Sequence, residues 1–174
     1  MTKYQATPTT TERNFGEDEI IVSKTDSAGR ITYANDVFLR VAGFSENEVL
    51  GQPHSIVRHP DMPRCVFKLL WDQIAARREI FAYVKNMAKN GDYYWVFAHV
   101  TPSYDADGAV TGFHSNRRTP TRGAIQKIEP LYRDLLAEEA RHGDRKLGMQ
   151  AGFDKLVKAL DHHKVTYDQF VFSL

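Results

Sequence analysis

Three side chains that can bind phosphate or exchange protons stand within four consecutive positions of the chain. Arg58 carries a guanidinium, His59 an imidazole and Asp61 a carboxylate, with prolines at positions 60 and 63. A guanidinium fork matches phosphate oxygens, so Arg58 suits a phosphorylated ligand, which His59 can also hydrogen-bond while Asp61 orients either neighbour. The alternative is a rigid loop in which Asp61 only favours the N-terminus of the next helix.

Two asparagines occupy positions where a primary amide needs a hydrogen-bond partner. Asn35 precedes a run with helical spacing, so it either caps that helix or contacts a ligand. Asn86 shares a strand face with Ala82 and Val84, because side chains on one face of a strand repeat every two residues. A buried amide among small apolar side chains requires a partner, which a ligand or nearby backbone can supply.

Histidine and aromatic side chains add further candidates. His54 and His59 lie in one proline-rich stretch, and either can serve as an axial ligand of a haem iron. Phe67 and Trp71 stand four residues apart on one face of a predicted helix, where they either fill the core or wall a cofactor pocket. Cys65, in the first turn of that helix, is interpreted as a packing residue.

The elements that must position these side chains follow from hydrophobic periodicity and turn signals. Strands are predicted at residues 20–25, 30–33, 80–88, 93–103 and 109–118. Helices are predicted at 35–43, 45–51 and 63–78, whereas the proline-rich residues 52–62 are expected to be irregular. Two strands, a helical middle and a three-stranded meander imply an α+β fold, in which helices pack on one face of an antiparallel sheet.

The predicted strand at 93–103 has two apolar faces rather than one. Alternate residues from Tyr94 onward suit the core, while the opposite face carries Tyr93, Trp95 and Phe97. A sheet face exposed to water would be more polar, so we expect the C-terminal helices, the N-terminal segment or a second subunit to cover these aromatic rings. We interpret this face as an interaction surface.

The C-terminal part of the chain is predicted to be helical. Met149, Phe153 and Leu156 begin an amphipathic stripe that packs either on the domain's own sheet or on a partner helix, so they join the predicted interaction surface. Polar residues 138–146 are expected to form a linker. We divide the chain into a flexible N-terminal segment, a folded domain and a helical extension, at residues 1–19, 20–120 and 121–174.

Composition excludes several classes of protein. Lysine and arginine total 23 against 22 aspartates and glutamates, and a net charge of +1 is too small for a non-specific nucleic-acid binder. The single cysteine excludes an intrachain disulfide framework. No apolar run is long enough to span a membrane and the first residues have no signal-peptide core, so we expect a soluble, cytoplasmic protein. No catalytic triad, phosphate-binding glycine loop or paired-carboxylate motif indicates an enzyme.

The element order resembles that of PAS domains, which are sensory modules built on a five-stranded antiparallel sheet. Residues 51–63, GQPHSIVRHPDMP, resemble the signature of bacterial aerotaxis receptors. The likeness extends to 89–96, KNGDYYWV, and to 129–132, EPLY. One departure is Ile-Phe-Ala at 80–82, where that family usually has Trp-(Ser/Thr)-Gly.

The resemblance implies a non-covalent FAD in a redox or oxygen sensor that reports to chemotaxis-type signalling through self-association, as a homodimer, or through a partner. It makes these residues candidates for cofactor binding: Asn35, His54, Arg58, His59, Asp61, Phe67, Trp71 and Asn86. Two alternatives stay open, a haem-binding gas sensor and a cofactor-free interaction module whose pocket is filled by Phe81 and its neighbours. The cysteine of blue-light PAS domains would align near His54 and not at Cys65, so no photoadduct is expected.

Overall fold

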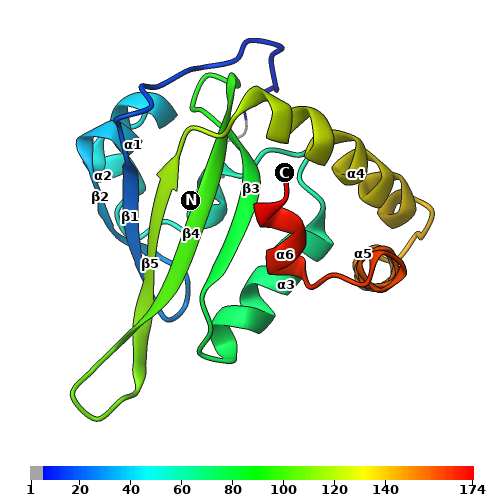
Figure 1. Cartoon of the computed structure of the whole chain (residues 1–174). Helices are drawn as coiled ribbons and strands as arrows, with labels where there is room; N and C mark the ends of the chain where they lie inside the picture. The colour runs from blue at the N-terminus through cyan, green and yellow to red at the C-terminus, as the bar shows by residue number, and fades with distance from the viewer. Residues whose placement is uncertain (1–5) are drawn as a thin grey trace.

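The computed structural model describes residues 6–174, which fold into one five-stranded sheet with helices around it (Figure 1). The strands and helices follow the order β1 (Ile21–Asp26), β2 (Ile31–Ala34), α1 (Asp36–Ala42), α2 (Glu46–Val49), η1 (His54–Val57, a 3₁₀ turn), α3 (Arg64–Ala75), β3 (Ile80–Met87), β4 (Tyr93–Tyr104), β5 (Val110–Arg118), α4 (Arg122–Ala140), α5 (Arg145–His163) and α6 (Tyr167–Phe172). Among these residues no helix is both long enough and apolar enough to cross a membrane.

All neighbouring strands are antiparallel, in the spatial order β2-β1-β5-β4-β3. The helical middle of the chain, from α1 to α3, packs on one face of the sheet, and α6 lies against β3 (Figure 1). The predicted α+β class is therefore confirmed. The expectation of irregular structure at 52–62 is wrong only for η1, a single turn that carries His54.

Local sequence explains where the first helix begins and ends. The Asn35 side chain accepts a hydrogen bond from the N–H of Phe38, which is the N-cap contact that its amide predicts. Gly43 ends the helix with a φ of +72°, in the left-handed region that favours glycine. The β3–β4 hairpin turns at Gly91 with a φ of +97°, as the Asn-Gly pair predicts.

Strand β3 is an edge of the sheet, and other segments occupy its free backbone groups. Arg58 forms an isolated antiparallel bridge with Asn86. The Tyr132 hydroxyl from α4 donates a 2.6 Å hydrogen bond to the Tyr83 carbonyl, and the Lys85 N–H lies 3.2 Å from the Met62 sulfur. An edge strand covered in this way is protected from pairing with another chain. The bridge between Arg58 and Asn86 also holds the Arg58 loop against the sheet.

The aromatic face of β3 and β4 is covered by the C-terminal helices. Trp95 stacks on Tyr132 of α4 with ring centroids 6.3 Å apart, and Phe172 of α6 packs against Phe81 and Phe97. Trp95 is buried, while Tyr93 and Phe97 remain half-buried. Of the covers expected from the sequence, the chain's own C-terminal helices lie on this face, and an interaction surface at the half-buried Tyr93 and Phe97 stays a prediction.

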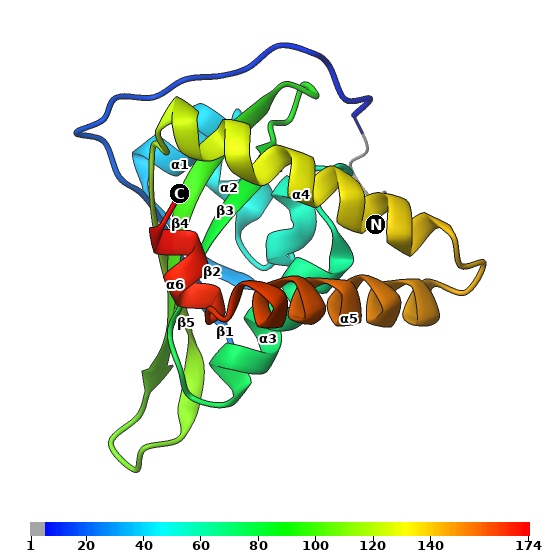
Figure 2. The same ribbon diagram turned by 45° about the vertical axis from the view of Figure 1, so that its right-hand side comes forward.

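Helices α4 and α5 form an antiparallel pair, and α5 also lies beside α3 (Figure 2). The predicted linker at 138–146 is wrong at both ends, because only residues 141–144 separate the two helices. The apolar stripe predicted for α5 also differs from the face of the helix that is most buried. The buried residues of α5 are Gly148, Gly152 and Leu156, whereas Met149 and Phe153 lie at the margin of the contact.

Glycines allow α5 to approach α4 and α3 closely. A Cβ at Gly148 would lie 2.4 Å from the Glu139 carbonyl oxygen, and one at Gly152 would lie 3.2 Å from the Cys65 sulfur. Neither alanine nor any larger residue fits at Gly148 without moving backbone. Leu156 therefore packs within the same chain, while a partner contact at the half-buried Met149 and Phe153 stays a prediction.

The N-terminal segment is more ordered than its composition predicts. Residues 9–13 run along the β3–β4 turn, where Thr9 donates to the Gly91 carbonyl and Arg13 to that of Tyr93. Arg13 also forms an ion pair with Asp92 at 3.2 Å. Residues 9–13 are thus held against the β3–β4 hairpin, and the first five residues of the predicted flexible segment lie outside the described part of the chain.

Candidate functional site

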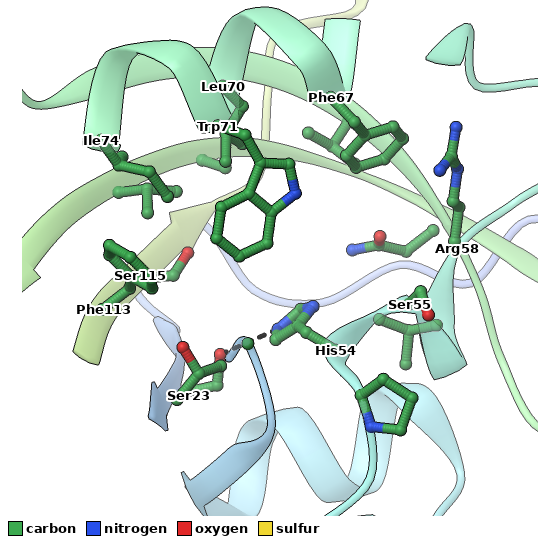
Figure 3. A pocket seen from close by; sticks show the side chains of 18 of the residues that line it. Ser23, His54, Ser55, Arg58, Phe67, Leu70, Trp71, Ile74, Phe113 and Ser115 are labelled. Atoms are coloured by element: carbon green, nitrogen blue, oxygen red, sulfur yellow. Dashed lines mark hydrogen bonds between the residues drawn. The ribbon is translucent and has the colours of Figure 1, made fainter. Parts of the chain in front are cut away.

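A cavity of about 290 Å³ lies between the inner face of the sheet and helix α3 (Figure 3). Its walls are mainly apolar and come largely from four strands, β1, β3, β4 and β5, and from α3, with Val84, Ala98, Val100, Leu70 and Ile74 among them. Ligand pockets range upward from about 300 Å³ and combine apolar walls with a few placed polar groups. The size and lining of this cavity match that description.

One end of the cavity holds a buried cation that no carboxylate among residues 6–174 balances. Arg117 on β5 is only 5% exposed. Its Nη2 donates to the Ser23 hydroxyl at 3.0 Å and to Nε2 of His54 at 2.7 Å, and both partners are neutral. Its other terminal nitrogen, Nη1, is buried without a hydrogen-bond partner among residues 6–174. Burial lowers the pKa of this guanidinium to about 10, so it stays charged at neutral pH.

His54 is held neutral beside this arginine. Burial and, second to it, the Arg117 charge lower the pKa of His54 to about 3. Because Nε2 accepts the hydrogen bond from Arg117, the ring proton must reside on Nδ1. Ser23 also lies 3.0 Å from Nε2, so the histidine, serine and arginine form one network at the polar end of the cavity.

Two further polar side chains line the cavity. The Ser115 hydroxyl on β5 is buried and has no hydrogen-bond partner among the described residues. Asn86 on β3 is 5% exposed, and its side chain interacts with the buried Tyr94 hydroxyl. The sequence therefore placed Asn86 on the correct strand face, and its partner within the protein is a tyrosine.

Helix α3 supplies an aromatic wall opposite these groups. Figure 3 shows Phe67 and Trp71 facing His54 and Ser23 across the cavity. Trp71 is 43% exposed and packs edge-on against Phe113 with centroids 5.4 Å apart. Trp71 therefore lies at the mouth of the cavity, where its indole separates the interior from solvent.

Arg58 lies at one end of the cavity, where its guanidinium carbon stands 4.0 Å from the centre of the Phe67 ring. A second, more open groove begins there, and the cavity and the groove share Pro53, Ser55 and Arg58. His59 lines the groove and not the cavity. It is 2% exposed, with Nδ1 accepting the Asp61 N–H at 3.1 Å.

Five of the eight predicted cofactor residues line the cavity, namely His54, Arg58, Phe67, Trp71 and Asn86. Asn35 does not, because its amide is used between Ile20, Val22 and Phe38 at the start of α1. Asp61 lies in neither hollow; its carboxylate is largely exposed and forms an ion pair with Lys85 at 2.8 Å. Asn35 thus caps α1, and the carboxylate of Asp61 pairs with Lys85 and does not reach the cavity.

Sequence reasoning missed the most unusual residues of the cavity, Arg117, Ser115 and Ser23. A signal was present, because Phe113, Ser115 and Arg117 alternate along β5 and so share its inner face. The neighbouring Arg118 makes that signal easy to overlook. Successive side chains on a strand point to opposite faces, so one of the two adjacent arginines must point inward. Cys65 does not line the cavity, and burial raises the pKa of its thiol to about 12, which agrees with a packing role.

A five-stranded antiparallel sheet with helices around a ligand-sized cavity is the architecture of PAS sensory domains. The family model of the PAS fold matches residues 31–117. The chain belongs to the PAS family, and its PAS domain is of the aerotaxis-receptor type. It is 40% identical over 132 residues to the aerotaxis receptor of Escherichia coli K12, covering 75% of this chain and 26% of that receptor.

Other relatives are more distant. The nitrogen fixation regulatory protein of Klebsiella pneumoniae is 27% identical over 99 residues, which cover 57% of this chain and 20% of that protein. The dark structure of the blue-light photoreceptor Aureochrome1 LOV aligns with a TM-score of 0.56 and 21% identity, covering 62% of this chain and 80% of that one. This likeness shows the fold alone. The chain spans only about a quarter of the receptor's length, so the receptor's full activity does not transfer with the match.

Proposed function

We propose that this PAS domain binds FAD in its cavity and acts as a redox or oxygen sensor in chemotaxis-type signalling. The observation that carries the proposal is the buried Arg117 at the polar end of the cavity, one of whose terminal nitrogens has no hydrogen-bond partner among residues 6–174. An uncompensated buried cation is costly, and a ligand with acceptor atoms or negative charge offsets that cost. The 40% identity to an aerotaxis receptor supports the same reading.

The residues present suit a flat ring with polar atoms along one edge. Arg117 and Ser115 offer unpaired polar groups, and Asn86 and His54 lie beside them. Phe67 and Trp71 from α3 face the opposite wall. When bound, a flavin supplies reversible electron exchange, and its reduced ring can carry negative charge.

Arg117 then has a defined role in sensing. A fixed cation next to the ring stabilises its more negative state, so Arg117 raises the tendency of the site to accept electrons. His54 stays neutral and holds Arg117 in place through its Nε2. A change of ligand charge alters the pull on this arginine and on the cavity walls, including α3.

The signal has a route from the cavity to the C-terminal helices. Helix α3 places Phe67 and Trp71 in the cavity wall, and α5 packs on another side of the same helix. A shift of α3 therefore changes the fit of α5. We propose that the output is altered self- or partner-association in the cytoplasm, as a homodimer or with a chemotaxis-type protein, and not turnover of a substrate.

The two alternative functions find less support. A haem would need a free histidine nitrogen in the cavity, but Nε2 of His54 is engaged by Arg117 and Ser23, and His59 lies outside the cavity. A cofactor-free module would need Phe81 to fill the space. Phe81 instead points to the other face of the sheet, where it stacks on His99 with centroids 4.1 Å apart.

The test is the visible absorption spectrum of the freshly purified protein, followed by anaerobic reduction. We expect a two-band yellow spectrum that bleaches and returns reversibly, with FAD released on denaturation. A Soret band would transfer the proposal to haem. A colourless protein that also fails to take up added FAD would refute flavin binding.

A further inference from the structure

The groove beside the cavity concentrates positive charge from three separate segments. It is lined by Arg58 from the loop after η1, Arg64 from the start of α3 and Arg145 from the start of α5. The three guanidiniums are close enough to interact. Burial is the largest cause that lowers the pKa of Arg58, and the charge of Glu139 opposes it. The positive charges of Arg64 and Arg145 lower this pKa further. Side chains 87 positions apart thus converge on one hollow.

The acidic side chains that line the groove do not neutralise all of this charge. Glu139 is occupied by Arg64 at 2.9 Å and by the Cys65 N–H at 2.8 Å. Glu48 is held by the Ser45 backbone and by Lys89. Within the described part of the chain, no carboxylate lies within ion-pair distance of Arg145. Arg58 has the face of Phe67 as its partner, with no carboxylate within ion-pair distance among the same residues.

A buried donor in the groove lining is also unsatisfied. Nδ1 of His59 accepts the Asp61 N–H, so its Nε2 carries the ring proton in the neutral form. That Nε2 is buried and has no hydrogen-bond partner among residues 6–174. A buried donor without an acceptor costs free energy unless a ligand accepts its proton. The groove lining therefore contains an unsatisfied polar group in addition to the three arginines.

We infer that this groove is a site for an organic pyrophosphate, and that the C-terminal helices complete it by supplying Arg145. Guanidinium groups match phosphate oxygens in geometry and charge. The inference rests on the proposed function, because Pro53, Ser55 and Arg58 belong to both hollows. One dinucleotide can therefore reach from the cavity past Arg58 into the groove.

This assignment gives the C-terminal helices a role in ligand binding as well as packing. Arg145 is the first residue of α5, and the only covalent links of α5 to the rest of the fold are at residues 141–144 and 164–166. Phosphate bound by Arg145 therefore pulls the start of α5 toward Arg58 and Arg64. Ligand occupancy and the docking of α5 become coupled, since a group that binds two bodies stabilises their contact.

The test compares three flavins on the full chain, using Arg145→Gln and the matched control Lys146→Gln. Lys146 is exposed, carries the same charge and does not line the groove. Dissociation constants for FAD, FMN and riboflavin are measured by flavin fluorescence. We expect Arg145→Gln to weaken FAD binding about tenfold, because a charge-assisted hydrogen bond contributes at least that factor. Riboflavin binding should not change, and Lys146→Gln should match the wild type for all three.

Each outcome decides one proposal. Equal FAD affinity in Arg145→Gln and wild type, or equal wild-type affinity for FAD and riboflavin, overturns the pyrophosphate site while flavin binding stands. If no flavin binds, the proposed function fails, and titration with ADP tests the groove alone. ADP binding that Arg145→Gln weakens would keep a pyrophosphate site for a separate nucleotide, and absence of ADP binding would remove it.

Discussion

Two of the charged side chains that the fold buries, Glu139 and Arg117, have opposite surroundings. Glu139 on α4 is 2% exposed, and its carboxylate is paired with Arg64 and with the backbone N–H of Cys65. Arg117 on β5 is 5% exposed, but its partners are neutral and one of its nitrogens is unpaired. The first charge is satisfied by the protein, and the second is not.

The difference separates a structural role from a binding role. Glu139 links α4 to the start of α3 and lies under the glycine face of α5, so it holds the C-terminal helices in place. Arg117 hydrogen-bonds only to the neutral Ser23 and His54 among residues 6–174, so the fold does not balance its charge. A buried charge that the fold does not balance indicates a ligand that balances it. Substitutions at the two positions should therefore change different quantities.

The largest effect on stability is expected at Glu139. Glu139→Gln should lower the free energy of unfolding by about 2–3 kcal/mol, because it leaves Arg64 without its anion and weakens the contact with Cys65 N–H. Urea unfolding without flavin measures this. Glu138→Gln is the control, and it should cost no more than about 0.5 kcal/mol because Glu138 pairs with the exposed Arg141. Equal costs at both positions would remove the structural role assigned to Glu139.

His54 should make stability depend on pH. The pKa of His54 is about 3 in the folded protein, whereas its ordinary value is 6.5. Between these two pH values the unfolded chain binds a proton at His54 and the folded chain does not. Stability is therefore full above pH 6.5 and falls as the pH drops toward 3, by about 1–2 kcal/mol at pH 5. The free energy of unfolding should be measured at pH 7 and at pH 5. The loss of stability between the two pH values should be smaller in His54→Gln than in the wild type, and unchanged in the exposed His162→Gln. An unchanged pH dependence in His54→Gln would show that folding does not lower the pKa of His54.

Arg117 should behave unlike Glu139 when flavin is absent. Arg117→Met should change the free energy of unfolding by less than about 1 kcal/mol, since it removes an unbalanced buried charge. Ser23 and His54 remain 3.0 Å apart and can satisfy each other. Urea unfolding of the flavin-free protein tests this, with Glu139→Gln measured alongside it. A loss at Arg117 as large as that at Glu139 would make the arginine structural.

Trp71 should have the smallest effect, and only on the ligand. It is 43% exposed at the mouth of the cavity, so Trp71→Ala leaves stability within about 0.5 kcal/mol. An aromatic contact contributes about 1 kcal/mol, which predicts roughly fivefold weaker FAD binding. Fluorescence titration checks this against Trp95→Phe, which lies on the other sheet face. Equal affinities in both variants and the wild type would exclude Trp71 from the pocket wall.

Much of the fold could be predicted because its signals are local. The Asn35 cap, the Gly43 terminus and the Asn-Gly hairpin depend on neighbouring residues, and the five strands follow from short periodic runs. Phe67, Trp71 and Asn86 were predictable in the same way, since helix and strand periodicity place them on inner faces.

The remainder depended on contacts between distant segments. Among the described residues, the hydrogen-bond partners of Arg117 are only Ser23 and His54, which lie 94 and 63 positions away in the sequence. The sequence around Arg117 does not predict either contact. The close approach at Gly148 and Gly152 likewise requires knowledge of where Glu139 and Cys65 lie. The hydrophobic stripe alone therefore identified Leu156 but not the two buried glycines of α5.

The measurement that tests the central claim most directly is the FAD affinity of the full chain, wild type against Arg117→Met, by fluorescence titration at neutral pH. The account predicts binding by the wild type and at least tenfold weaker binding by the variant, with both proteins equally stable without flavin. Equal affinity in the two proteins would contradict the assignment of Arg117 as the ligand's anchor, and with it the claim that its unbalanced charge marks the site.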